Sequence, residues 1–230
     1  SHCGVRRHGS PASSFCLAAV MLLAGGCVSA PDSVDPPLAQ GEQLLRVGVA
    51  AYGESDYATA ASMFGKALTH YQSIDYAEGI LTSRVNLAEL SLAMGNADAV
   101  RHQLAAIDSL ELLPGGSGQA HRLRLLRAGL AISDGDPDAA EAWLTPLLEA
   151  GPAPADRVYL VALANRVQVE LLRDSGRETV WIERLQDHLA DQPSPDAVLL
   201  GRLRRYQAEV AMNAGMPDEA EALLREAYDQ

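Results

Sequence analysis

The chain has 230 residues, of which 48% are hydrophobic and only 5% aromatic, and its formal net charge is −12 at pH 7. This length allows one large or two small domains, and the abundance of Ala and Leu without alternating apolar runs favours helices over strands. The negative charge makes nucleic acid and anionic membrane surfaces unfavourable partners. Because the acidic residues form no long block, they are interpreted as a solvating coat and not as a cation site.

The three cysteines, Cys3, Cys16 and Cys27, all lie near the N-terminus. Cys3 precedes the apolar run that begins at Phe15, and Cys16 lies within it. The rest of the chain therefore has no disulfide framework and no cysteine-based metal site.

The N-terminal residues have the layout of a secretory signal. Arg6-Arg7-His8 forms a basic flank, Phe15 to Ala24 is unbroken apolar sequence, and Gly25-Gly26-Cys27 follows directly. A membrane-spanning helix needs about 20 apolar residues, so a retained span is the weaker interpretation. Cleavage after Ala30 would place Pro31 on the scissile bond, where proline is a poor substrate.

Leu23-Ala24-Gly25-Gly26-Cys27 resembles the lipobox of bacterial lipoproteins, although Leu23 stands one place earlier than in the usual pattern. The resemblance implies that residues 1–26 are a signal peptide and that Cys27 is acylated and becomes the new N-terminus. Val28 replaces the Asp that signals retention at the inner membrane, which implies the periplasmic face of the outer membrane. A protein secreted to the periplasm is the alternative. Residues 27–37 are predicted to form an extended tether, able to reach roughly 30 Å.

A degenerate repeat follows the tether. Its first copy is Gly53 to Leu68, and the copies place their turns at Ser55, Gly95, Gly135, Gly176 and Gly215, in steps of 40, 40, 41 and 39 residues. A constant period of this size is typical of stacked helical units. We expect five helix pairs in one domain over residues 38–230, with helices near 38–52, 56–71, 76–94, 97–112, 119–133, 137–150, 155–174, 178–190, 195–214 and 217–228.

The first copy resembles the tetratricopeptide repeat at Gly48, Asp56-Tyr57, Ala60, Phe64 and Ala67-Leu68. This resemblance implies an all-α, right-handed α–α superhelix, in which small residues let paired helices approach and Phe64 fills space toward the following unit. The step of 40 exceeds the family's usual 34 and resembles its long-repeat variants. Trp181 stands at a small-residue position of the fourth unit, so the alignment of that unit to the repeat is defined only to within one residue.

No catalytic constellation accompanies the repeats. The Gly-rich stretch 114–118 lacks the Lys-Ser/Thr of a phosphate-binding loop and is interpreted as a linker. His70, His102, His121 and His188 fall in different units without metal-binding spacing. We expect no enzymatic activity, no cofactor and no metal.

The tetratricopeptide resemblance implies a concave groove lined by the first helix of each pair. The family's carboxylate clamp would need Lys and Asn where Leu45 and Val49 stand, so binding of chaperone tails is disfavoured. Arg166 with Glu170 and Arg205 with Glu209 are also spaced as simple i,i+4 helix pairs. The expected partner-binding residues are Leu45, Val49, Tyr52, Asn86, Glu89, Arg122, Leu125, Arg166, Arg173, Arg202 and Arg205.

The expected function is that of a non-enzymatic, lipid-anchored scaffold that binds or recruits another cell-envelope protein. Its arginines in units four and five are expected to hold an acidic segment of that partner. A self-assembling solenoid and an accessory subunit of an envelope enzyme or assembly machine are the alternatives. Because no polar capping helix follows the last helix, we expect partial exposure of Ala220, Leu223, Leu224 and Ala227, and self-association or docking there.

Overall fold

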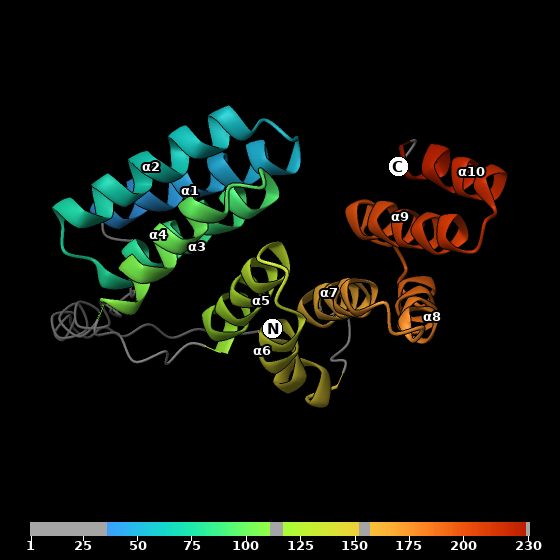
Figure 1. Cartoon of the computed structure of the whole chain (residues 1–230). Coiled ribbons are helices and arrows are strands. Elements are labelled where there is room, and N and C mark those ends of the chain that lie inside the picture. The colour runs from blue at the N-terminus through green and yellow to red at the C-terminus, as the bar shows by residue number, and fades with distance from the viewer. Residues whose placement is uncertain (1–35, 111–116, 152–156, 229–230) are drawn as a thin grey trace, which may run out of the picture. The chain divides into compact units, whose positions relative to one another are not determined.

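The computed structural model describes residues 36–110, 117–151 and 157–228, and these residues contain ten α-helices and no strand (Figure 1). The predicted signal peptide, the predicted acylation site Cys27 and most of the predicted tether lie outside the described residues. The helices are α1 (Pro36–Gly53), α2 (Tyr57–Ser73), α3 (Ala77–Ala93), α4 (Ala97–Asp108), α5 (Ser117–Ser133), α6 (Pro137–Glu149), α7 (Arg157–Arg173), α8 (Glu178–Ala190), α9 (Ala197–Asn213) and α10 (Pro217–Tyr228).

The helices pack in sequential pairs, as the repeat predicted. From α2 onward each helix contacts the next one along the chain, and α3, α5, α7 and α9 also contact one another in turn. The arrangement is an α-solenoid, in which each unit is stabilised by its neighbours. The predicted helix ranges agree closely with the observed ones, except that α4 ends at Asp108 and α1 already includes Pro36 and Pro37 of the predicted tether.

Turns of one design close the first helix of each pair. After α3, Gly95 adopts a left-handed φ of 70°, and the backbone N–H of Asn96 donates to the carbonyl of Ser91 at 2.8 Å. This hydrogen bond is that of a Schellman motif. The Asn96 side chain then accepts from the N–H of Ala99 at 3.1 Å and caps α4, and Asp56 and Asp136 cap α2 and α6 in the same way.

Small residues allow the first two helices to touch, as the resemblance implied. A Cβ added at Gly48 of α1 would lie 2.5 Å from the ring of Phe64 on α2. Ala60 and Ala67 of α2 are fully buried. Phe64 joins a buried cluster with Leu90 of α3, so it also fills the space toward the second pair.

The apolar core is divided into five clusters along the array, each shared by neighbouring helices. All the buried residues that form them lie between Ala51 and Ala220. The largest joins α7, α8 and α9. A fragment of residues 36–230 therefore contains all the described helices together with their own core.

The fourth turn departs from the spacing that the sequence suggested. The residue with left-handed φ in the equivalent place is Asp174 (φ 48°), and the N–H of Ser175 donates to the carbonyl of Glu170 as Asn96 does to Ser91. The turns thus stand at 55, 95, 135, 174 and 215, in steps of 40, 40, 39 and 41. Two more residues stand between Asp174 and the start of α8 than in the other turns, and Gly176 (φ 68°) is one of them. This shifts the frame of α7 by two residues relative to a frame set at Gly176.

Candidate functional site

Arg122 of α5 links two of the odd-numbered helices. Its guanidinium donates to both carboxylate oxygens of Glu89 on α3, at 2.8 and 2.6 Å, and to the side-chain oxygen of Asn86 at 2.5 Å. Asn86 is buried, whereas Arg122 and Glu89 are partly exposed. The two-pronged contact orients the guanidinium in the plane of the carboxylate, which a single hydrogen bond does not do.

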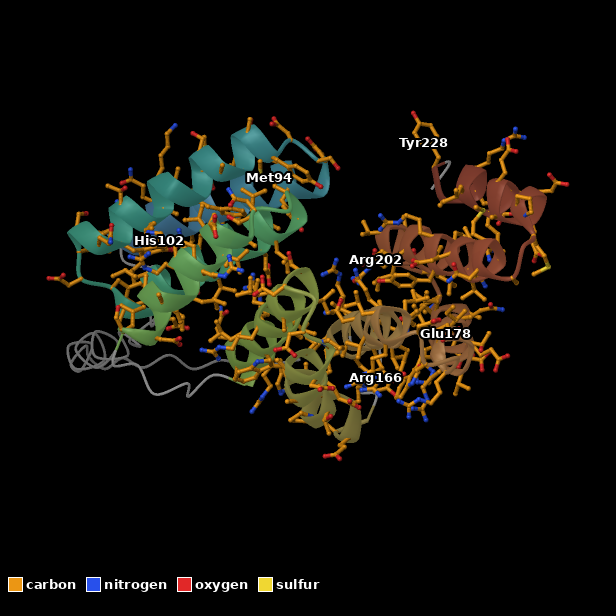
Figure 2. The ribbon with its side chains drawn as sticks, in the orientation of Figure 1. Met94, His102, Arg166, Glu178, Arg202 and Tyr228 are labelled. Atoms are coloured by element: carbon orange, nitrogen blue, oxygen red, sulfur yellow. The ribbon has the colours of Figure 1, made fainter. Side chains whose placement is uncertain are left out.

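The same arrangement returns two units later. Arg202 of α9, labelled in Figure 2, donates to the side-chain oxygen of Asn165 on α7 at 2.8 Å and to the hydroxyl of Tyr206 at 2.7 Å. Asn165 stands 79 residues after Asn86, and Arg202 stands 80 after Arg122. Asn165 was not among the expected groove residues, because a frame set at Gly176 puts other α7 residues in the groove. The spacing from Asn86 is the signal that could have identified it.

Arg157, at the start of α7, was also missed. Its Nε donates to Asp196 at 2.8 Å, and Asp196 caps α9 by accepting from the N–H of Val198 at 2.9 Å. Burial alone would raise the pKa of Asp196, but the hydrogen bond and charge of Arg157 and the backbone donors of α9 hold this pKa below its usual value.

Tyr52 is the partly buried aromatic residue expected in the groove on α1. Burial raises the pKa of its phenol above the usual value, and the negative charge of Glu89 adds to this effect, whereas the positive charge of Arg157 opposes it. Its ring lies 5.8 Å from that of Tyr57 on α2 and packs against the Phe64 cluster. We call the set Tyr52, Glu89, Arg122, Arg157 and Arg202, which has one member on each odd-numbered helix, the odd-helix strip.

Two of the arginines expected in the groove lie elsewhere. Arg166 is buried and forms ion pairs with Glu141 of α6 and Glu170 of α7. Arg173 pairs with Asp138 at 2.5 Å and with Glu141 at 2.6 Å. Both guanidinium groups therefore point toward even-numbered helices, as the two-residue shift of the α7 frame requires.

Glu170 is the centre of this buried network. Its carboxylate has no exposed surface and accepts hydrogen bonds from Arg166, from the Ser175 hydroxyl at 2.5 Å and from Arg177 at 3.4 Å. Burial alone would raise its pKa, but the Ser175 hydrogen bond and the charges of Arg166 and Arg177 lower the pKa below the usual value. The arrangement holds an ionised carboxylate between α7 and the fourth turn, which is a structural role.

The remaining expected residues have separate environments. Leu45 packs against the Phe64 cluster, and Leu125 packs against the cluster shared by α5, α6 and α7. Val49 is exposed on α1. Arg205 and Glu209 are exposed on α9, and the described ion pairs do not include one between them. The structure thus brings together Asn86, Glu89 and Arg122, and separately Asn165 and Arg202.

Within the described ranges no group of three or more His, Cys, Asp or Glu is placed to hold a metal ion. The described helices are also too short or too polar for any of them to cross a membrane. Comparison of the chain with models of known protein families, with curated proteins and with solved structures found no match.

Proposed function

We propose that this chain is a tetratricopeptide-like scaffold without enzymatic activity, and that its odd-helix strip binds a carboxylate-bearing segment of another protein. The observation that carries the proposal is the presence of Arg122, Arg157 and Arg202 on three consecutive odd-numbered helices, each held by a polar partner of the chain. Such held guanidinium groups lose little conformational freedom when they bind a ligand.

The strip replaces the groove of four arginines that the sequence suggested. Arg157 is largely exposed, and its ion pair with Asp196 is of the surface kind that contributes under about 1 kcal/mol. A partner carboxylate can therefore exchange with Asp196 at little cost. Tyr52 adds an aromatic ring at one end of the strip, next to the exposed Val49.

We further propose that the scaffold is held at the periplasmic face of the outer membrane by acylation of Cys27, with secretion to the periplasm as the alternative. The support is the lipobox-like Leu23-Ala24-Gly25-Gly26-Cys27 sequence. Replacement of Cys27 by Ser, followed by cell fractionation, tests the anchor. A processed variant that still fractionates with the membrane would contradict acylation at this residue.

Site-specific photo-crosslinking in cells tests the binding surface. A photoreactive residue is placed at Val49, beside the strip, and in a matched control at Val180, which is exposed on the even-numbered helix α8. We expect a protein adduct from Val49 that falls at least tenfold when Arg157 is replaced by Ala. No adduct at Val49, or one equally strong at Val180, would overturn the proposal.

A further inference from the structure

On each odd-numbered helix from α3 onward, the residue at one equivalent position contacts the even-numbered helix of the preceding pair. Leu87 of α3 packs on the cluster that contains Phe64 of α2, and Arg127 of α5 donates to Asp108 of α4 at 2.5 Å. Arg166 of α7 pairs with Glu141 of α6, and Gln207 of α9 is hydrogen-bonded to Gln186 of α8 at 3.0 Å. The counterpart on α1 is Val47, which no described helix covers and which is 39% exposed.

On the even-numbered helix α10, the face that would contact a following pair is exposed. Glu141, Leu144 and Leu148 of α6 face α7, and Leu144 is completely buried. The residues 80 positions later on α10 are Glu221, Leu224 and Tyr228. Leu224 is 48% exposed and Tyr228 is 92% exposed, and Figure 2 shows Tyr228 pointing away from the other helices. The surface that receives the next pair on α6 is thus bare on α10.

The neighbouring helix α9 extends the same surface. Val198 and Met212 are exposed on it, and Arg205 lies between them. In contrast, Leu125 and Ile132 of α5, 80 residues before Arg205 and Met212, belong to the core shared with α7. We call Val198, Arg205, Met212, Leu224 and Tyr228 the C-terminal face.

The outcome for the last helix differs from expectation at one residue. Ala220 was expected to be partly exposed, but it is buried against Ala208 and Ala211 of α9. Its side chain points toward the paired helix, as Ala140 does in α6. Leu224, one turn later, is the most exposed of the four residues named for this helix.

We propose that the C-terminal face of one chain docks on Val47 and the adjoining surface of α1 in a second copy, head to tail. The contact would continue the packing that joins each pair to the next within the chain. Val47 would meet Glu221 and Leu224, as Arg166 meets Glu141.

Charge also favours a second copy as the occupant. The helix α1 carries the exposed Arg46 directly before Val47. The helix α10 has Arg225 as its only basic residue, against the acidic Asp218, Glu219, Glu221 and Glu226. An interface that joins two different faces builds rings or open chains of molecules, so more than two copies can associate.

Sedimentation of fragment 36–230 tests the association. We expect concentration-dependent assembly that Val47→Glu and Leu224→Glu each weaken at least tenfold. Val198→Glu and Val180→Glu form a matched pair, because both valines lie in the first turn of a helix and are 66% and 64% exposed. Only Val198→Glu should weaken assembly. A fragment that remains monomeric at the highest concentration, or equal effects of the two substitutions, would overturn the proposal.

Crosslinking establishes the orientation, since residues 36–230 contain no cysteine. Fragments with Val47→Cys and with Glu221→Cys are treated with a bismaleimide, alone and mixed. We expect an adduct only in the mixture. An adduct of Glu221→Cys with itself would show a symmetric contact and overturn the head-to-tail arrangement. Capture of a different protein on the C-terminal face, with the fragment monomeric, would overturn the second copy as occupant. Neither experiment depends on the odd-helix strip.

Discussion

Arg166 and Glu170 form an ion pair one helical turn apart on α7, and the carboxylate of Glu170 has no exposed surface. Removing one partner of a buried pair leaves an uncompensated charge, which typically costs about 3–5 kcal/mol. We therefore expect Arg166→Ala to lower the free energy of unfolding by this order, as measured by urea titration. Arg101→Ala is the control, because its ion pairs lie at the surface and should contribute under about 1 kcal/mol. Equal losses for both variants would show that the network does not hold the fourth unit.

Acid should weaken the fold through the same network. The pKa values of Glu170 and Glu141 are lowered in the folded chain, because nearby arginines and hydrogen bonds outweigh their burial. These carboxyls bind fewer protons in the folded than in the unfolded state. The stability they contribute is fully present above the unfolded pKa, about 4.3, and is lost as the pH falls through the folded pKa. The free energy of unfolding, measured between about pH 3 and 7, should fall at the acidic end. Glu170→Gln should make this fall shallower, and Glu219→Gln on exposed α10 should leave it unchanged.

The Asn165–Arg202 contact should be energetically coupled. Asn165→Leu removes a buried acceptor from a guanidinium donor and should cost about 1–3 kcal/mol. The double variant Asn165→Leu, Arg202→Met should lose less stability than the sum of the single variants, because neither group is then left without its partner. Strict additivity of the two losses in a double-mutant cycle would contradict the coupling.

Two glycines should respond oppositely to the same substitution. Gly48→Ala places a Cβ against the Phe64 ring and should destabilise the fold by about 1–3 kcal/mol. Gly65→Ala, inside α2, meets no atom within 4 Å and should stabilise it by about 0.5–1 kcal/mol through helix propensity. Thermal unfolding of both variants measures the difference. A stabilising Gly48→Ala would show that α1 and α2 do not approach this closely.

The sequence predicted the helix pairs because their signals are local. Turn residues, caps such as Asp56 and Asp136, and small residues such as Gly48 recur at a nearly constant step, and each acts within its own turn or pair. The fold class could therefore be predicted without knowledge of any contact between units.

The predicted site depended on the frame of α7, which local signals did not determine. Glycine usually marks a left-handed turn residue, yet in the fourth turn Asp174 takes this role and Gly176 belongs to a turn that is longer by two residues. A shift of two residues rotates a helix by more than half a turn. Because of this rotation, Arg166 contacts Glu141 of α6 and does not line the expected groove. Asn165 occupies the position on α7 that Asn86 occupies on α3. Contacts between units decide which arginines pair with carboxylates of the chain and which line the groove, and these contacts cannot be predicted from local sequence.

If the odd-helix strip binds a partner carboxylate as proposed, loss of one of its arginines must weaken that binding. Once the protein crosslinked at Val49 is identified, its dissociation constant from fragment 36–230 can be measured by titration calorimetry for three variants. We expect Arg122→Ala and Arg157→Ala each to weaken binding at least tenfold, and Arg101→Ala, on the even-numbered helix α4, to change it less than twofold. Equal small changes for all three variants would contradict the claim.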